Sequence, residues 1–348
     1  MADPPAFLRN IWYFAMPSAA LAPGRMVARK LLDEPVLIGR DRNGKAFAMR
    51  DVCPHRAIPL SFGKFDGKEV ECRYHGWRFD GEGRCTHIPA LTGNEPLTAE
   101  KVRVRTYRLH EAQGCIWIFM QAPRTPPVDP PEPPSLPGEP GDAAPVLTVT
   151  MPFPCAIDHA VVGLMDPAHG PFVHKSWWWR SQASVHEKEK RFGPSPLGFT
   201  MLRHAPSRNS FAYKILGGSP ETEISFLLPG IRIESILVGR HRVLNLTTVT
   251  PADGEGTVVT HSIYATMRWA WWLKPLLRVF VRRFLEQDRS VVAMQQQGLR
   301  YESNLLLVRD ADTQARWYYQ LKNEFAQSQG DGREFVNPVR STTLRWRS

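Results

Sequence analysis

Two short segments of this chain each combine one cysteine with one histidine. Cys53 and His55 form a C-x-H pair, and Cys72 and His75 form a C-x-x-H pair after sixteen intervening residues. Two thiolates and two imidazoles can bind zinc, or a [2Fe–2S] cluster in which two histidines replace two cysteines on one iron. Structural zinc sites usually take their cysteines from one loop and their histidines from another. One of each per loop therefore favours the iron–sulfur cluster.

A second group of residues has the types found in mononuclear iron sites. Asp166, His169 and His174 follow the pattern D-x-x-H-x4-H. Gly170-Pro171 between the histidines predicts a break in the chain that lets both imidazoles converge. Two histidines and one carboxylate can hold Fe(II) with positions left open for other ligands. Asp166 before a proline is also a good helix N-cap, so this segment alone does not separate a metal site from an ordinary helix start.

The carboxylate that would complete such a triad is Asp288. Residues from about Lys274 to at least Gln297 have the pattern of one long helix, with Pro275 in its first turn. Its expected inward stripe, at spacings of three and four, is Leu277, Val281, Phe284, Asp288, Val291 and Gln295. A buried carboxylate without a partner is costly, so Asp288 should bind a metal or pair with an arginine. Glu286 and Asp310 are weaker candidates, because Glu286 lies off the stripe and Asp310 beyond the helix.

The elements that position these residues fall into two parts on either side of a proline-rich segment. Ten of the 23 residues from Pro123 to Pro145 are proline, which predicts an extended, polyproline-like connector. We therefore expect domains at residues 1–122 and 146–348, joined by residues 123–145. Before the connector, strand pairs with turns at Asn43-Gly44 and near Gly114 predict a mostly antiparallel β domain.

The part after the connector combines strands with the long helix. A run of β-rich segments separated by Gly and Pro predicts one antiparallel sheet, and the whole chain is assigned to the α+β class. The segments are residues 209–216, 222–228, 231–238, 242–250 and 257–267. Phe211, Tyr213, Phe226, Leu228 and Ile236 can line a substrate pocket there or be plain core.

Composition places this 348-residue chain among ordinary globular proteins. Lys and Arg outnumber Asp and Glu by 44 to 34, and the net charge of +10 favours anionic partners without naming one. No segment long enough to span a membrane is free of charges, and Asp3 with two early prolines stands where a secretory signal needs a basic region. We expect a cytoplasmic protein with reduced cysteines. Cys85, Cys115 and Cys155 are then ordinary buried thiols.

The flanks of the metal-binding pairs resemble a known family. The segments C53-P-H-R56 and C72-R-Y-H-G-W-R-F79 closely resemble the Rieske signature of ring-hydroxylating oxygenase α-subunits. The segment around Asp288 looks like the third-ligand segment of the shorter, single-subunit, vanillate O-demethylase-like members. The resemblance implies an N-terminal all-β Rieske domain and a helix-grip-like catalytic domain. It also implies a [2Fe–2S] cluster on Cys53, His55, Cys72 and His75, and Fe(II) on His169, His174 and Asp288.

The same resemblance implies how such a protein works. Asp166 matches the aspartate that links the Rieske histidine of one subunit, here His75, to an iron-binding histidine of the next, here His169, in a head-to-tail homotrimer. NAD(P)H would supply electrons through a flavin reductase or ferredoxin, and O₂ would be the co-substrate. Monooxygenation of a largely apolar aromatic or sterol-like compound, including demethylation, is favoured over cis-dihydroxylation. Relatives often carry Asn where this chain has Gly163, which makes the surroundings of the iron less transferable.

Other interpretations stay open at this point. In one, the protein is a Rieske electron carrier whose second domain only binds a ligand, and in the other it is a zinc-stabilised binding module. No nucleic-acid-binding signature is present, so we expect no nucleic-acid partner. The Trp-rich, basic segment from Met267 to Phe284 can seat a helix at a membrane surface or form a helix with one basic, solvated face. Asp158 and His159 are candidates for residues that support the iron ligands without binding iron.

Overall fold

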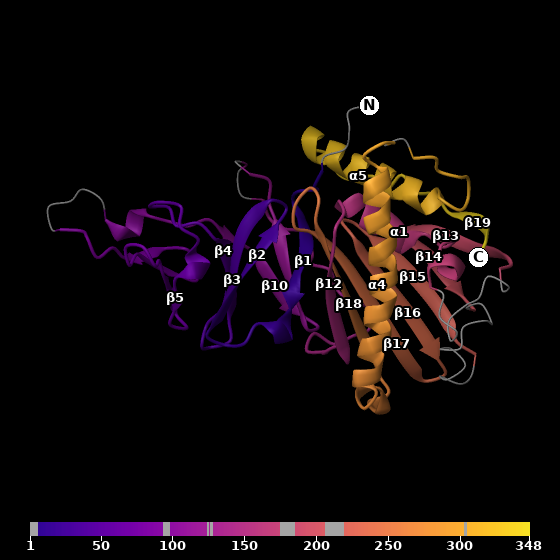
Figure 1. Ribbon diagram of the computed structural model, residues 1–348, viewed down its shortest axis with the longest axis horizontal. Coiled ribbons are helices and arrows are strands. Elements are labelled where there is room, and N and C mark those ends of the chain that lie inside the picture. Colours follow the sequence, from indigo (N-terminus) through magenta and orange to yellow (C-terminus); the bar gives the residue numbers. More distant parts are fainter. Residues whose placement is uncertain are drawn as a thin grey trace. The chain divides into compact units, whose positions relative to one another are not determined.

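The computed structural model describes residues 6–92, 98–123, 125, 128–174, 185–205, 219–302 and 305–348. The chain divides into two compact units (Figure 1). One unit is Arg9–Ala143, and the other is Ala144–Ser348 together with the residues before Arg9. In the described part of the chain, no helix is both long and apolar enough to cross a membrane.

The first unit consists of three small sheets whose strand pairs are all antiparallel, which confirms the predicted β domain. Their strand orders are β1-β11-β10, β2-β3-β4-β9 and β5-β6-β7-β8. The strands are β1 (Ile11–Pro17), β2 (Arg25–Leu31), β3 (Glu34–Arg40), β4 (Ala46–Arg50), β5 (Lys64–Phe65), β6 (Glu69–Glu71), β7 (Arg78–Asp80), β8 (Cys85–His87), β9 (Thr106–Tyr107), β10 (Leu109–Ala112) and β11 (Cys115–Met120). Both predicted turns are present, with φ of 90° at Gly44 and 71° at Gly114.

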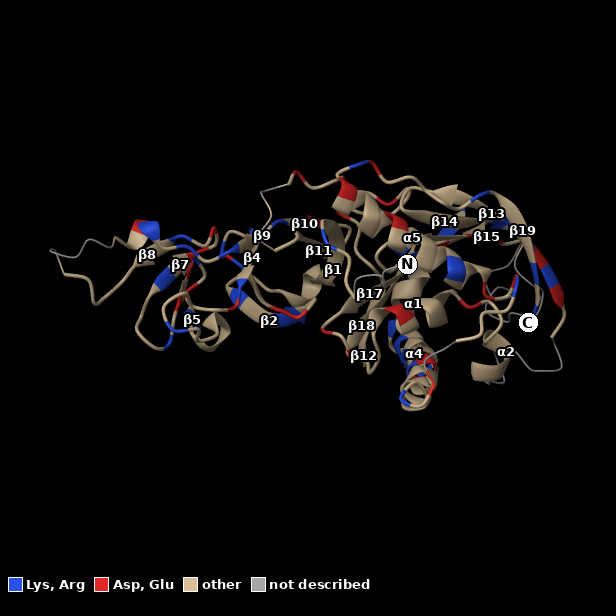
Figure 2. Cartoon of the chain, turned by 90° about the horizontal axis from the view of Figure 1, so that it is seen from above, with Lys and Arg blue, Asp and Glu red and all other residues tan. Residues whose placement is uncertain are grey.

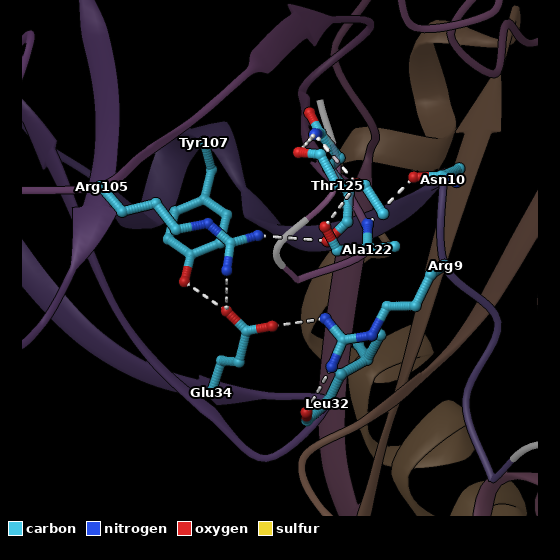
Figure 3. Close-up of polar contacts among 9 residues, drawn as sticks. Arg9, Asn10, Leu32, Glu34, Arg105, Tyr107, Ala122 and Thr125 are labelled. Carbon is cyan, nitrogen blue, oxygen red and sulfur yellow. Dashed lines mark hydrogen bonds and ion pairs between the residues drawn. The ribbon is translucent and has the colours of Figure 1, made fainter. Parts of the chain in front are cut away.

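A cluster of polar side chains around Glu34 links the segment before β1 to the sheet that contains β3 and β9 (Figure 3). The Glu34 carboxylate accepts hydrogen bonds from the Tyr107 hydroxyl at 2.6 Å and from Arg105 at 3.3 Å. It also forms an ion pair with Arg9, whose guanidinium donates to the Leu32 carbonyl oxygen at 3.2 Å. Burial and the neighbouring carboxylate raise the pKa of Tyr107. The cluster thus joins Arg9, two residues before β1, to β3 and β9.

The proline-rich segment packs on the first unit. Its described residues form neither helix nor strand, as the composition predicts. The Trp12 indole N–H donates to the Pro131 carbonyl oxygen at 2.8 Å. The Gln113 side-chain amide donates to the carbonyl oxygens of Leu136 and Glu139 at 3.1 and 2.8 Å and accepts from the Leu136 N–H at 2.8 Å. Buried polar atoms thereby hold this segment in place.

The second unit is one eight-stranded antiparallel sheet with helices, which confirms the α+β class. The strand order is β12-β18-β17-β16-β15-β14-β13-β19. The strands are β12 (Leu147–Phe153), β13 (Glu187–Ser195), β14 (Gly198–His204), β15 (Glu221–Leu227), β16 (Ile231–Val238), β17 (His241–Pro251), β18 (Thr257–Ala265) and β19 (Thr342–Arg347). The helices are α1 (Ile157–Met165), α2 (Gly170–Val173), α4 (Lys274–Gly298) and α5 (Thr313–Asp331), with 3₁₀ turns including η5 (Arg268–Trp271). Figure 1 shows α4 running across the strands.

Several of these elements were expected from the sequence, and others were not. The helix α4 and the strands β15 to β18 lie where the pattern predicts them. The strand expected at residues 209–216, with Phe211 and Tyr213, lies outside the described residues. The predictions did not include α5 or β19, which pairs with β13 from Glu187 opposite Arg347 to Phe192 opposite Thr342. A pairing between such distant segments leaves no local pattern.

The inward face of α4 differs from the predicted stripe at one position. Asp288 does face inward, with 20% of its side chain exposed. Val291, however, is 39% exposed, whereas Val292 is 6% exposed and Leu285 is 3% exposed. The predicted inward position of Val291 is therefore wrong. Leu285 and Val292 are seven residues apart and lie on one side of the stripe, so the buried face of α4 is centred between the stripe and these two residues.

A buried ion pair holds α1 against α5. The Lys322 ammonium lies 2.6 and 2.8 Å from the two carboxylate oxygens of Asp158, and the Tyr318 hydroxyl donates to the same carboxylate at 2.6 Å. Only 2% of the Lys322 side chain is exposed. Asp158 therefore supports the fold at the helix that leads into the predicted iron-binding segment.

We predict that Lys322→Met lowers the free energy of unfolding by about 3–5 kcal/mol, because it leaves the Asp158 carboxylate without its cation. Chemical denaturation followed by far-UV circular dichroism measures this change. The matched control is Arg345→Met, which removes the exposed ion pair with Glu189 and should change stability by no more than about 1 kcal/mol. Equal effects of the two substitutions would contradict the structural role of the buried pair.

Candidate active site

The two Cys/His segments form loops of matching geometry in the first unit. The backbone N–H groups of Cys53 and Cys72 each donate to the carbonyl oxygen five residues further on, at 2.8 Å in both loops. Each loop also has a positive φ four residues after its cysteine, 57° at Ala57 and 69° at Gly76. The two loops therefore share one backbone geometry, although the histidine follows the cysteine by two residues in the first loop and by three in the second.

Within this pair of loops the thiols lie inside and the imidazoles outside. Cys53 and Cys72 are 2% and 3% exposed and hydrogen-bond to each other. Burial and this neighbouring thiol raise the pKa of Cys53 to about 11. The rings of His55 and His75 lie 4.6 Å apart between centroids, and Trp77 stacks on His55 at 4.6 Å and 6°. His55 is exposed and His75 is half-buried.

The spacing of these four donors fits a cluster with two metal ions. Among the described residues, no three of them bring their ligand atoms within 4.8 Å of one another. A tetrahedral zinc ion with bonds of ~2.0–2.3 Å would hold its ligand atoms within about 4 Å of one another. A [2Fe–2S] cluster instead takes the two thiolates on one iron and the two imidazoles on the other. The donor set therefore fits the cluster better than a single zinc ion.

In the second unit, His169, His174 and Asp288 come together. Their ligand atoms all lie within 4.8 Å of one another. The two Nε2 atoms are 3.1 Å apart, and Asp288 Oδ1 lies 3.6 Å from Nε2 of His169 and 3.3 Å from Nε2 of His174. The two histidines flank the single helical turn of α2, which has a proline in its first turn, and Asp288 comes from α4. No arginine forms an ion pair with Asp288 in the described part of the chain.

Hydrogen bonds on the far side of each imidazole turn its Nε2 toward the candidate metal position. His169 Nδ1 lies 2.8 Å from the Asp166 carbonyl oxygen, and His174 Nδ1 lies 3.1 Å from Gln287 Oε1. Since both oxygens can only accept, each Nδ1 carries the hydrogen and each Nε2 offers a lone pair. The ring of His174 also stacks on Phe284 at 3.8 Å.

The electrostatics of this group call for a cation. Burial raises the pKa of Asp288 to about 6, so the ionised carboxylate is costly there without a positive partner. Two neutral imidazoles and one carboxylate are the donor set of the facial triad that holds Fe(II) with open positions. The three side chains therefore fit a divalent iron ion.

The remaining candidates lie beside this group or away from it. Asp166 Oδ2 is 3.6 Å from His169 Nδ1, so Asp166 touches a candidate ligand. Asp166 ends α1 and accepts from the Ala168 N–H at 2.7 Å, so the expectation of a helix N-cap is wrong. Glu286 pairs with Arg289, and Asp310 accepts from the Arg345 N–H, so neither joins the triad.

Two neighbours of the triad were not foreseen in these roles. Gln287 orients His174, and its only sequence signal is its place beside Asp288 on the helix. Gly163 lies where α1 meets α4, and a β-carbon there would be 3.7 Å from Val292 Cγ1.

The other residues singled out in the sequence are partly or fully buried. His159 is half-buried, and this burial lowers the pKa of its imidazole. Phe226 and Leu228 are each 2% exposed and Ile236 is 6% exposed, as expected for core residues.

Comparisons with known proteins identify the family of this chain. The Rieske [2Fe-2S] domain model matches residues 11–108. The chain is 32% identical over 271 residues to the oxygenase component of dicamba O-demethylase from Stenotrophomonas maltophilia, covering 74% of this chain and 72% of that protein. The chain belongs to the Rieske non-haem iron oxygenases.

Other relatives of this Rieske oxygenase cover the chain to different extents. It is 27% identical over 304 residues to the chloroplastic protein TIC 55 of Pisum sativum, covering 84% of this chain and 51% of that protein. The chain thus spans about half the length of TIC 55. The crystal structure of dicamba monooxygenase bound to dicamba superposes with a TM-score of 0.75 at 20% identity, over 93% of this chain and 99% of that chain. That likeness supports the same fold.

We predict that Gln287→Leu weakens Fe(II) binding at the triad by roughly tenfold to a hundredfold, because His174 loses the acceptor that sets its tautomer. Competition with a fluorescent iron chelator measures the affinity. The visible absorbance of the Rieske cluster is the internal control and should not change. Gln297→Leu, an exposed position on the same helix, is the matched control. Wild-type iron affinity in Gln287→Leu would show that this hydrogen bond does not support the site.

Proposed function

We propose that this chain is the terminal oxygenase component of a multicomponent Rieske system. The observation that carries the proposal is the convergence of His169, His174 and Asp288 in a chain that also pairs two buried thiols with two outer imidazoles. Electrons from NAD(P)H would arrive through a flavin reductase or ferredoxin. The protein would use O₂ to hydroxylate or oxidatively demethylate a largely apolar substrate.

In this proposal each group of candidate ligands and its neighbours has a separate role. Cys53, Cys72, His55 and His75 hold the [2Fe–2S] cluster, which passes single electrons. His169, His174 and Asp288 hold Fe(II), which supplies O₂ activation when it is bound. The Asp166 carbonyl oxygen and Gln287 keep the imidazoles in the metal-binding tautomer. The apolar ring of Phe284 covers one side of His174.

The names of relatives favour monooxygenation. They include a 4beta-methylsterol monooxygenase from Methylococcus capsulatus, which is 37% identical over 114 residues, and a toluene-4-sulfonate monooxygenase subunit from Comamonas testosteroni, which is 36% identical over 117 residues. Oxidative demethylation or hydroxylation is therefore our first choice for this chain. Cis-dihydroxylation and pure electron transfer without oxygenase chemistry are the alternatives.

We propose the head-to-tail homotrimer as the working assembly. His75 is half-buried near the surface of its unit, and Asp166 lies 3.6 Å from His169, as a link between the two metal sites of neighbouring subunits requires. The net charge of +10 suits an acidic ferredoxin as the electron donor. We place this assembly in the cytoplasm.

Metal analysis of anaerobically purified protein tests the function. We expect about three iron and about two acid-labile sulfide per chain, and the loss of about one iron in Asp288→Ala. The matched control is Glu286→Ala, two residues away on the same helix, which should keep all three. About two iron and two sulfide, unchanged by Asp288→Ala and by added Fe(II), would leave an electron carrier.

The segment from η5 into α4 supports a peripheral membrane contact. Trp272 is 86% exposed, and Trp269 and Trp271 are each 46% exposed. Leu276 and Val279 are more than half exposed on the next turns. No acidic residue occurs between residues 267 and 285, and Figure 2 shows basic residues along α4. Exposed tryptophans beside basic side chains suit the interface of an anionic bilayer.

We predict that the protein sediments with vesicles of phosphatidylcholine containing phosphatidylserine and not with phosphatidylcholine alone. Replacing Trp271 and Trp272 by serine should weaken this binding about tenfold, because the indole rings no longer enter the interface. Tyr301→Ser, which changes a side chain that is 92% exposed, is the control. Equal sedimentation of the wild type with both kinds of vesicle, or none with either, would exclude this contact.

A further inference from the structure

A polar row crosses the helix-covered face of the large sheet. Arg232 on β16 lies directly opposite Thr247 on β17, which lies directly opposite His261 on β18. Opposite residues of antiparallel strands point to the same face. Arg232 is also opposite Phe226, whose ring packs against Tyr318 of α5 at 5.9 Å. This row, here called the Arg232–His261 row, therefore points toward the side of the sheet that the helices cover.

Glu234 fixes one side of the Arg232 guanidinium. Arg232 Nη1 donates to Glu234 Oε2 at 3.2 Å, and the Asn245 side-chain amide donates to the same oxygen at 3.4 Å. The side chains of Arg232 and Glu234 are only 20% and 15% exposed. Within the described residues Arg232 makes no other hydrogen bond. Its Nε and Nη2 hydrogens are therefore available to a ligand.

His261 offers a second donor at the other end of the row. The Thr247 hydroxyl lies 2.8 Å from His261 Nδ1. The threonine hydroxyl has no other acceptor among the residues described, so it donates to Nδ1 and leaves the ring hydrogen on Nε2. Burial first, and then the charge of Arg232, lowers the pKa of His261 to about 4. The ring is therefore neutral at pH 7 and donates a single N–H.

The row lies under the helices that carry the candidate iron ligands. A β-carbon at Gly230, two residues before Arg232, would lie 3.2 Å from Val161 Cγ2 of α1, and α1 packs on α4, which carries Asp288. The helix α1, which leads to Asp166, contacts β17 and β18. A molecule held by Arg232 and His261 would thus lie on the same side of the sheet as the triad.

A gain in folding stability does not explain why the side chains of the Arg232–His261 row are buried. Burying an ion pair and an imidazole on a sheet face often stabilises the fold no better than apolar packing does. Buried ionisable side chains whose pKa values are strongly shifted are typical of functional sites. Here N–H hydrogens on two different strands, at Arg232 Nε and Nη2 and at His261 Nε2, have no protein acceptor in the part of the chain described.

We propose that the Arg232–His261 row binds an oxygen acceptor on the substrate, a carbonyl or carboxylate remote from the carbon that is oxidised. The inference rests on the proposed oxygenase function and adds a polar anchor to its largely apolar substrate. Glu234 balances the charge of Arg232, so the row can take a neutral carbonyl as well as a carboxylate. The apolar remainder of the substrate would extend toward His169, His174 and Asp288.

Calorimetric binding to the anaerobic holoprotein tests the row with probes that differ in one group. The aromatic set is 4-methoxyacetophenone, 4-methoxybenzoate and 4-ethylanisole, and the larger set is androst-4-en-3-one and androst-4-ene. We expect the acceptor-bearing member of at least one set to bind about tenfold more tightly than its hydrocarbon match, as a hydrogen bond to a charged donor contributes. Comparing the affinities of the ketone probes with that of 4-methoxybenzoate shows whether the row prefers a neutral or an anionic acceptor.

Substitutions assign the preference to the row. The double variant Arg232→Met/Glu234→Gln removes the guanidinium without leaving an unpaired carboxylate, and His261→Phe removes the second donor at similar size. Both should reduce the preference to about twofold or less. The control Arg203→Met/Glu221→Gln removes an exposed ion pair of the same sheet and should keep it. Thermal unfolding of each variant shows whether it is folded. If only one of the two row variants folds, that variant is enough for the test.

Two results overturn the inference. One is a wild type that binds hydrocarbon and acceptor probes equally in both sets, and the other is an unchanged preference in a folded row variant. Iron content separates this failure from failure of the proposed function. A wild type with the full iron content but no acceptor preference contradicts the row alone. A protein without the mononuclear iron contradicts the oxygenase function, whatever the probes show.

Discussion

The candidate active centre depends on one constraint, which is that two imidazoles and one carboxylate must point their free lone pairs at the same place. The single turn of α2 between His169 and His174 brings the two Nε2 atoms to 3.1 Å. The hydrogen bonds to the Asp166 carbonyl oxygen and to Gln287 then keep the hydrogens on the far nitrogens. Without those acceptors the histidines could adopt the other tautomer, and the site would bind a metal more weakly.

The rest of the second unit holds these three side chains in position. α1, which ends at Asp166, is fixed to α5 by the buried Lys322–Asp158 pair, and α4 carries Asp288 across the sheet. The sheet contributes a rigid face that bears the Arg232–His261 row. Rigid elements thus support the candidate metal ligands from one side and the proposed substrate anchor from the other, as a preorganised site requires.

In the first unit, two loops hold the candidate ligands of the cluster. Its small sheets supply two turns of the same backbone geometry, each with a positive φ four residues after the cysteine. That repetition buries both thiols and turns both imidazoles outward. A cluster held in this way has its histidine side nearest to solvent, which suits exchange of electrons with a partner.

The sequence alone indicated the candidate ligands of both sites, because metal-binding residue types at short spacings are local information. The spacing and flanking residues indicated Cys53, His55, Cys72 and His75 as candidate ligands. The inward-facing stripe of one helix indicated Asp288, although Val291 of the same predicted stripe is exposed. Only the tertiary structure decided what surrounds them. The Gln287 acceptor, the Lys322–Asp158 pair and the Arg232–His261 row depend on helix packing and on strand register. Such contacts join segments far apart in the chain, and no local pattern encodes them.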